Sequence, residues 1–483
     1  MEYIGKILKD KYYVLVFFLC HASMWLFLLI KVYCGIITVK GGFTITTISI
    51  KKKFFSYIIP SLSAMIIFSL YSMVDGFFVS KYVGVEALSA VNISTPFINI
   101  VFALGIIAAV GSQTMCGVFI GRKNYMKANK IFSFNILTVA VLSVLLTLIF
   151  YFNLDRIATL LGATEDLKPL VLKYIGYIVY FVPFLMISYN FEVLVKVDGF
   201  PRLAVATVIT CGLSNVILDY VFVGLMGKGL EGAAVATGIS QVISTVVYLI
   251  HFTLGKSNLE FVEVKFSFDT LKSIFSLGVG DFVSEVGIAM IVLFYNIFII
   301  RFLGEKSIAT FSVVSYVNNL ALTCFAGITQ GTQPLLSYYY GKKDYDTLKK
   351  LFRYASIAIL ITGTVFLLAS QVLAREIFNI FLDVDEETML YSILSLRKFS
   401  ISFMITGFNV LIAAVCVSFL KPKYSVVINV LRSFVMIYLA LFVLTMIEPT
   451  LIWFASSVSE AMTLVFAFVF YKKLSKENRE RYE

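Results

Sequence analysis

Segment 111–132, GSQTMCGVFIGRKNYMKANKIF, recurs at 331–352 as GTQPLLSYYYGKKDYDTLKKLF, and this recurrence decides how the chain folds. Identical residues stand at a constant spacing of 220 positions (331 − 111), without a gap. Apolar composition alone would not align polar residues and glycines so regularly. The matched pairs are Gly84 and Gly304, Asn99 and Asn319, Gly111 and Gly331, Gln113 and Gln333, Gly121 and Gly341, Lys123 and Lys343, Tyr125 and Tyr345, Lys130 and Lys350, and Phe132 and Phe352. The sequence therefore predicts two copies of one structural unit.

The chain around the repeat is apolar enough to lie in a membrane. Of its 483 residues, 59% are hydrophobic and 14% are charged, and the mean hydropathy is +0.91, far more apolar than a soluble domain. A transmembrane helix needs about 20 apolar residues. By that measure we expect twelve spans, at 54–79, 87–118, 131–152, 170–195, 203–226, 231–254, 271–302, 307–338, 352–373, 391–419, 424–447 and 450–471. One further apolar stretch lies near 12–38.

These spans and the repeat together predict the fold class. Six spans separate each residue from its repeat partner, so both halves run through the bilayer in the same direction. We expect an all-α membrane protein with twelve transmembrane helices in two parallel-repeat six-helix bundles. Its predicted domains are an N-terminal segment 1–53, a first lobe 54–265, and a second lobe with a basic tail 266–483. The stretch 12–38 could be an uncleaved signal peptide, an added helix or sequence without a structural role.

The net charge of +11 indicates orientation in a membrane rather than nucleic-acid binding. The Lys and Arg residues lie in short loops, not along one helix face with interleaved aromatic residues. The strongly basic connections fall on one side of the predicted bilayer, and the opposite side carries the acidic run at 383–387. We therefore expect a multi-pass protein of a bacterial-type inner membrane, with both ends of the twelve-helix unit in the cytoplasm.

Few residues offer enzymatic or metal chemistry. There are only two histidines, and six cysteines lie scattered through apolar segments without a C-x-x-C pair. We interpret the cysteines as small core residues. The sequence predicts neither an enzyme nor a bound cofactor.

Two aspartates inside predicted spans stand out, because an ionised side chain there costs about 2.5 to 3.5 kcal/mol unless it faces a cavity, a partner or an ion. Asp75 is late in the first span, and Asp219 is in the fifth, four residues after Asn215 and on the same helical face. Thr237, early in the next helix, offers a hydroxyl oxygen at a similar depth. Carboxylate, amide and hydroxyl oxygens suit a hard monovalent cation, and a desolvated carboxylate could carry a proton instead.

Several motifs together resemble the multidrug and toxic compound extrusion family. They are the stretch 60–84, the loop IGRKNY, the segment KVDGFPRLA, the N-x-x-x-D of the fifth span, and GLEGAAVAT. The resemblance covers about residues 54–473. It implies a V-shaped pair of six-helix lobes that alternates access and exports organic cations in exchange for Na+ or H+.

The resemblance also assigns a cation site. In the family's amino-terminal lobe, that site uses positions that match Asp75, Asn215, Asp219 and Thr237. Glu192 stands where many relatives carry an asparagine, which adds charge to the predicted site and leaves the coupling ion open.

Other polar residues in the spans admit two interpretations each. Glu285, at the start of the seventh span, either binds a cation or substrate, as acidic residues there do in some family members, or is solvated near a helix end. Arg432 and Glu460 either pair or line a cleft, or Arg432 extends to the cytoplasmic face. We expect Gln113 and Gln333 to support helix packing.

The expected partners are small organic cations and the lipid bilayer, with the protein acting as a monomer. One rival interpretation is a lipid-linked saccharide flippase, whose cleft should be basic, whereas the buried groups here are mainly acidic. A second is a polytopic membrane transferase, for which the sequence shows no HExxH motif and no large extramembrane domain.

Overall fold

The computed structural model describes residues 49–304, 306–382 and 384–480, and every regular element in these ranges is a helix. The predicted apolar stretch 12–38 lies outside the described residues. The first half contains α2 (Ile50–Tyr82), α3 (Val85–Gly121), α4 (Tyr125–Tyr151), α5 (Leu154–Leu160), α6 (Lys168–Val197), α7 (Pro201–Asp219), the π-helical segment η1 (Tyr220–Leu225) and α8 (Gly229–Leu254). The second half contains α9 (Phe268–Phe302), α10 (Lys306–Lys342), α11 (Tyr345–Val372), α12 (Ala374–Phe381), α13 (Glu386–Phe399), η2 (Ser400–Ser402), α14 (Phe403–Ser418), α15 (Pro422–Val430), the π-helical η3 (Leu431–Val435), α16 (Met436–Ile447), η4 (Pro449–Phe454) and α17 (Ala455–Glu480).

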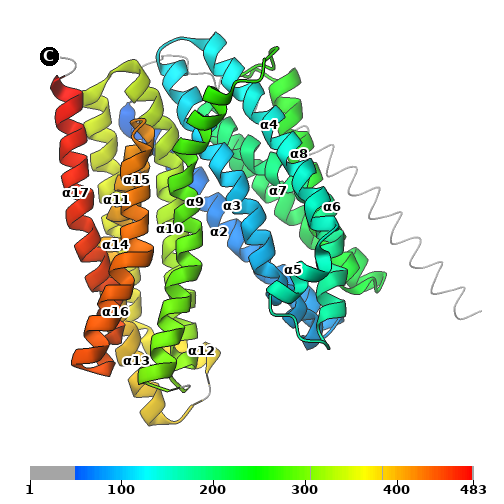
Figure 1. Ribbon diagram of the computed structural model, residues 1–483, viewed down its shortest axis with the longest axis vertical. Coiled ribbons are helices and arrows are strands. Elements are labelled where there is room, and N and C mark those ends of the chain that lie inside the picture. The colour runs from blue at the N-terminus through cyan, green and yellow to red at the C-terminus, as the bar shows by residue number, and fades with distance from the viewer. Residues whose placement is uncertain (1–48, 305, 383, 481–483) are drawn as a thin grey trace, which may run out of the picture.

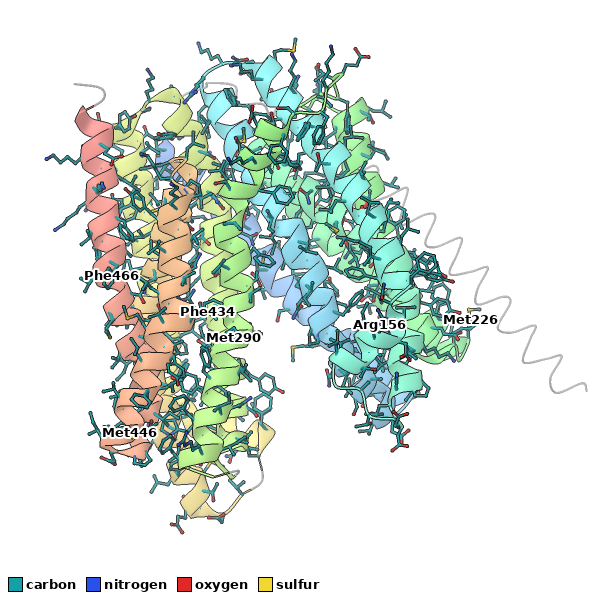
Figure 2. The ribbon with its side chains drawn as sticks, in the orientation of Figure 1. Arg156, Met226, Met290, Phe434, Met446 and Phe466 are labelled. Carbon is teal, nitrogen blue, oxygen red and sulfur yellow. The ribbon has the colours of Figure 1, made fainter. Side chains whose placement is uncertain are left out.

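Twelve helices in the described residues are long and apolar enough to cross a membrane, which confirms the expected number. Several are continuous through a change of helix type, as where α7 runs on into η1. The outward faces carry many large apolar side chains, among them Met446 of α16 and Phe466 of α17 (Figure 2). Lipid rather than water suits such a surface.

The helices form two bundles that correspond to the two copies of the repeat (Figure 1). In the first bundle (α2–α8), α6 packs against α3 and α8, and α2 packs against α7. In the second bundle (α9–α17), α14 packs against α17, and α15 packs against α9. The bundles meet where α3 contacts α9 and α10, and where α2 contacts α10. The first helix of each bundle therefore packs on the second helix of the other, as a two-fold repeat requires.

The repeated glycines Gly121 and Gly341 lie where α3 and α10, one from each bundle, pack closely together. A Cβ atom on Gly121 of α3 would stand 2.0 Å from the carbonyl oxygen of Tyr338, and one on Gly341 of α10 would stand 2.0 Å from that of Val118. These two contacts are equivalent, because Val118 and Tyr338 are also 220 positions apart. Only glycine allows the backbones to come so close.

The turns that follow α3 and α10 have the same backbone. Lys123 and Lys343 adopt positive φ angles of 60° and 63°, a conformation that side chains usually avoid. The next residues, Asn124 and Asp344, cap α4 and α11 by accepting a hydrogen bond from the backbone N–H three residues on. The corresponding residues of the two repeats thus form the same local structure: the end of a helix, a residue with left-handed backbone and the N-cap of the next helix.

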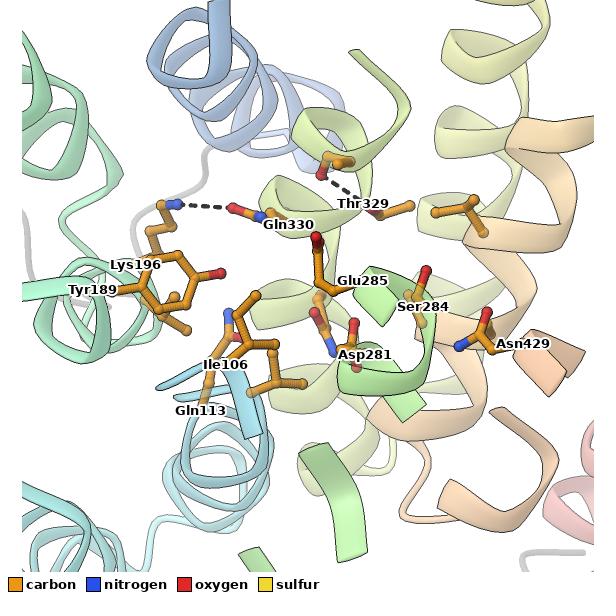
Figure 3. A pocket seen from close by; sticks show the side chains of 17 residues that line it. Ile106, Gln113, Tyr189, Lys196, Asp281, Ser284, Glu285, Thr329, Gln330 and Asn429 are labelled. Atoms are coloured by element: carbon orange, nitrogen blue, oxygen red, sulfur yellow. Dashed lines mark hydrogen bonds between the residues drawn. The ribbon is translucent and has the colours of Figure 1, made fainter. Parts of the chain in front are cut away.

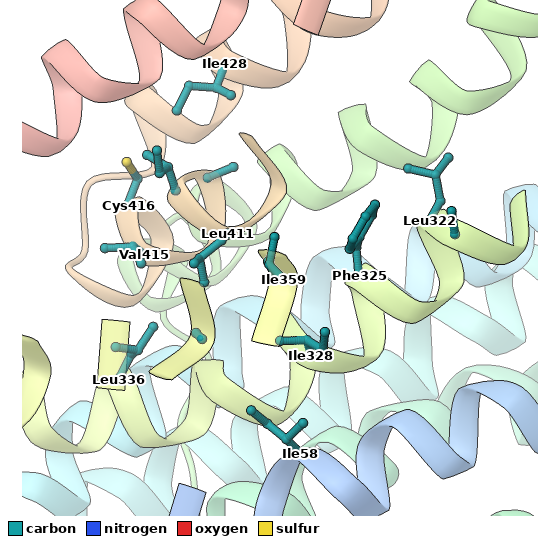
Figure 4. Close-up of a cluster of buried hydrophobic side chains, with 14 of the residues drawn as sticks. Ile58, Leu322, Phe325, Ile328, Leu336, Ile359, Leu411, Val415, Cys416 and Ile428 are labelled. Atoms are coloured by element: carbon teal, nitrogen blue, oxygen red, sulfur yellow. The ribbon is translucent and has the colours of Figure 1, made fainter. Parts of the chain in front are cut away.

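A continuous apolar core ties the bundles together at this end of the molecule (Figure 4). Phe325 and Ile328 of α10 belong to it, with Ile359 of α11 and Leu411 of α14. Ile58 of α2 brings the first bundle into the same core.

Candidate functional site

Four predicted site residues meet inside the first bundle. Asp75 comes from α2, Asn215 and Asp219 from α7, and Thr237 from α8. Asn215 and Asp219 are fully buried, and the Asn215 Nδ2 donates a hydrogen bond to the Thr237 Oγ1 at 3.4 Å. The carboxyl groups of Asp75 and Asp219 are close enough to interact electrostatically.

Small residues allow these three helices to converge. A Cβ atom on Gly212 of α7 would stand only 3.3 Å from the ring of Tyr71 in α2. In α8, Ala233, Ala234 and Ala236 have no exposed surface. Asp219 ends the α-helical part of its span, and the π-helical η1 begins at the next residue. Single π-helical turns within α-helices occur frequently at functional sites.

The oxygens of this cluster have fewer partners than their burial demands. Asp75 Oδ1, both carboxylate oxygens of Asp219 and Asn215 Oδ1 are buried and accept no hydrogen bond from the described residues. Burying an acceptor without a partner is costly, and two ionised carboxylates in a low-dielectric site also repel each other. A shared proton or a small cation would relieve both costs, so the arrangement suits either.

Glu192 already has a basic partner. Its Oε1 lies 2.8 Å from the Nζ of Lys196, one turn further along α6, and that Nζ also lies 3.5 Å from the Oε1 of Gln330 in α10. The contacts of Glu192 within the described residues therefore lead toward the second bundle rather than to the Asp75 cluster. A role of Glu192 in ion binding stays a prediction.

A second polar site is a cavity between the bundles (Figure 3). Helices α3, α6, α9, α10, α14 and α15 all contribute to its lining. Its polar lining residues are Gln113, Tyr189, Lys196, Asp281, Ser284, Glu285, Thr329, Gln330, Gln333 and Asn429.

The position of Glu285 differs from our prediction. Because α9 begins at Phe268, Glu285 lies near the middle of the helix rather than near its start, and its exposed side chain lines the cavity. Asp281, which we did not predict as a site residue, lies one turn earlier on the same lining face and has a buried Oδ2 without a hydrogen-bond partner among the described residues. The spacing of four residues in DFVSE was the available signal.

The remaining polar residues of the spans also have clear positions. Gln113 and Gln333 do more than pack, because both line the cavity, and the buried Nε2 of Gln333 has no partner among the described residues. Arg432 and Glu460 pair at 2.6 Å and are both 4% exposed, so pairing is confirmed. The interpretation that Arg432 extends to the membrane surface is wrong.

The chain matches a known family over most of its length. The MatE family model matches residues 60–221 and 282–442, one segment in each copy of the repeat. The multidrug export protein MepA of Staphylococcus aureus is 21% identical over 440 residues, which cover 89% of this chain and 96% of MepA. MepA of Staphylococcus saprophyticus is 22% identical over 336 residues, covering 69% of this chain and 74% of that protein.

Solved structures share the fold. An outward-facing multidrug resistance MATE family transporter of the MOP superfamily superposes with a TM-score of 0.83 and 19% identity, over 89% of this chain and 97% of that one. A second structure is a MOP superfamily transporter from Pyrococcus furiosus, described as having a binding pocket of reverse polarity that suggests a different function. It superposes with a TM-score of 0.82 and 20% identity, over 88% of this chain and 96% of that one. With more than half of its residues matched by the family model, the chain belongs to the MatE family of multi-pass membrane transporters, the multidrug and toxic compound extrusion family, and not to a family of enzymes.

Proposed function

We propose that this protein is a secondary active exporter that exchanges Na+ or H+ for organic cations. The observation that carries the proposal is the set of buried oxygens of Asp75, Asn215 and Asp219 without hydrogen-bond partners among the described residues. The naming of the relatives as multidrug export proteins supports the same function.

In this mechanism the coupling ion changes the relative stability of two arrangements of the bundles. A cation or proton at Asp75 and Asp219 removes their mutual repulsion and allows α2 and α7 to pack closely. An ion that binds one arrangement more tightly shifts the population toward it, by no more than the difference in its two binding free energies. Loss of the ion reverses the shift.

The charged loops support an orientation of the bundles in the membrane. The bundles lie close at the end that carries the turns after α3 and α10, and they diverge toward α5 and α12 (Figure 1). At these turns stand the basic residues Arg122, Lys123, Lys342 and Lys343, which the positive-inside rule assigns to the cytoplasm. With this orientation, the arrangement of Figure 1 faces outward.

The cavity between the bundles is the proposed substrate site. Asp281 and Glu285 supply negative charge, and the charge of Lys196 is balanced by Glu192. A cavity with this balance favours a positively charged substrate over the phosphate of a lipid-linked saccharide, which a flippase would have to hold. We propose that the protein works as a monomer in a bacterial inner membrane.

The test is transport of a fluorescent organic cation in proteoliposomes, with Na+ and pH gradients imposed separately. Changing Asp75 and Asp219 to Asn together removes both acids while keeping their size, and we expect the ion-driven rate to fall roughly 10- to 100-fold. The matched control is Asp155→Asn, which breaks an exposed ion pair with Lys168 and should leave the rate unchanged. Parental rates in the double variant would exclude the proposed ion site, and the gradient that drives the parent identifies the ion.

A further inference from the structure

The second bundle contains a buried charged cluster of its own. The Arg432 Nε donates to the Glu460 Oε1 at 2.6 Å, and the Asn409 Nδ2 donates to the Glu460 Oε2 at 2.7 Å. The Ser459 Oγ donates to the backbone oxygen of Arg432 at 3.2 Å. Asn409 is fully buried, and the two charged residues are almost fully buried.

The cluster stands on helices that correspond to those of the first bundle. In each bundle the fifth span contains a π-helical segment: η1 follows Asp219 directly, and η3 contains Arg432. The acid of the second cluster, Glu460, comes from the sixth span, as Thr237 does in the first bundle. Position 295, which is 220 residues after Asp75, holds a tyrosine whose hydroxyl accepts a hydrogen bond from the backbone N–H of Ser456 at 2.9 Å.

The two clusters differ in how their carboxylates are satisfied. Both oxygens of Glu460 accept a hydrogen bond from a side chain, one of them charged. Both oxygens of Asp219 lack a partner among the described residues. The second bundle therefore contains, as part of its own chain, the positive charge that the first cluster lacks.

We infer that Arg432 is the resident cation of the second bundle and occupies a latent monovalent-cation site formed by Glu460 and Asn409. The guanidinium neutralises the carboxylate permanently, so this helix pair exchanges no ion during transport. Ion exchange by the first bundle rests on the proposed function. The existence of the latent site in the second bundle does not depend on it.

Removing the guanidinium should expose this site. Arg432→Met keeps much of the side-chain volume and leaves Glu460 as an uncompensated buried carboxylate, which must then take up a proton or a cation. Asn409 continues to donate to the Glu460 Oε2, so the Oε1 is the carboxylate oxygen that the guanidinium leaves free for the ion.

The experiment measures binding of radioactive Na+, and proton uptake at fixed pH, by purified full-length protein. The background carries Asp75→Asn and Asp219→Asn, so that any gain comes from outside the first bundle and does not depend on the proposed function. We expect R432M to gain about one cation or proton per chain, and R432M/E460Q to gain none. A folded R432M protein that gains neither overturns the inference.

R432M could fail to fold, because breaking a buried ion pair often costs about 3 to 5 kcal/mol. In that event the double variant R432M/E460M tests the inference, because replacing both charged residues by apolar ones often leaves the stability of the protein unchanged. We expect this double variant, in an otherwise unchanged chain, to keep the parental ratio of ions to substrate. A folded double variant with a changed ratio, or without transport, overturns the inference, since Arg432 would then act in transport directly.

Discussion

Single residues in the repeat show how local backbone chemistry was duplicated along with the helices. Lys123 is exposed and has a φ of 60°, which costs a non-glycine residue roughly 1 to 2 kcal/mol. We expect Lys123→Gly to stabilise the protein by about 0.5 to 1 kcal/mol, because glycine adopts this conformation without strain. The measurement is the midpoint temperature of thermal unfolding in detergent.

The control for this prediction is Lys130→Gly, an exposed position in α4 with a helical backbone. Glycine there should destabilise the protein by about 1 kcal/mol. Equal losses of stability in both variants would contradict the assignment of strain to Lys123.

Some site residues could be predicted from the sequence and others could not. The i, i+4 spacing identified Asn215 and Asp219 as one helical face, and the cost of charge in lipid singled out Asp75. The partner of Glu192 could not be predicted from the sequence. Lys196 neutralises it only once α6 has formed, and Lys196 is also held by Gln330, which is 134 residues away in sequence. The role of Asp281 depended in the same way on a cavity between two bundles.

Among the elements, the connection between the bundles is fixed to the first bundle. Residues 255–267 join α8 to α9, and the buried carboxylate of Asp198, from the KVDGFPRLA segment, holds them. It accepts hydrogen bonds from the Asn258 backbone N–H at 2.7 Å and from the Ser257 Oγ at 3.0 Å, and it contacts the His251 Nε2 at 2.8 Å. No pattern in the sequence pointed to this pairing, since Asp198 and His251 are distant along the chain.

Because Asp198 holds the connection, neutralising its carboxylate should loosen residues 257–259. Asp198→Asn should weaken the hold on residues 257–259 by about 3 kcal/mol, because a buried charged acceptor is lost. We expect hydrogen exchange of the Asn258 and Leu259 amides to increase by roughly two orders of magnitude. Asp269→Asn, an exposed change at the start of α9, is the control, and equal exchange in the two variants would argue against the anchoring role.

The regular elements were easier to predict than their interruptions. Hydropathy located all twelve spans, because each must cover the same bilayer thickness. The π-helical segments η1 and η3 were not predicted, since they depend on packing between helices and not on the residues within one helix. The short helices α5 and α12 were missed because each is shorter than a span.

On the scale of the whole molecule, the repeated glycines set how closely the two bundles can approach. The reciprocal contacts of Gly121 with Tyr338 and of Gly341 with Val118 leave no room for a side chain. If the bundles alternate access as proposed, this crossing must be tight in the arrangement seen here and looser in the opposite one.

A single methyl group at this crossing should therefore shift the balance between the two arrangements. In Gly121→Ala the new Cβ would stand 2.0 Å from a carbonyl oxygen, so α3 and α10 must separate by about 1 Å or more. Spin labels on the repeat partners Met126 and Asp346 report one end of the molecule, and labels on Leu160 and Ile380 report the other; all four residues are exposed. We expect G121A to lengthen the first distance and shorten the second, whereas Gly176→Ala, whose Cβ has its nearest neighbour at 3.9 Å, should change neither. Unchanged distances in a folded G121A protein would show that this crossing does not control the arrangement of the bundles.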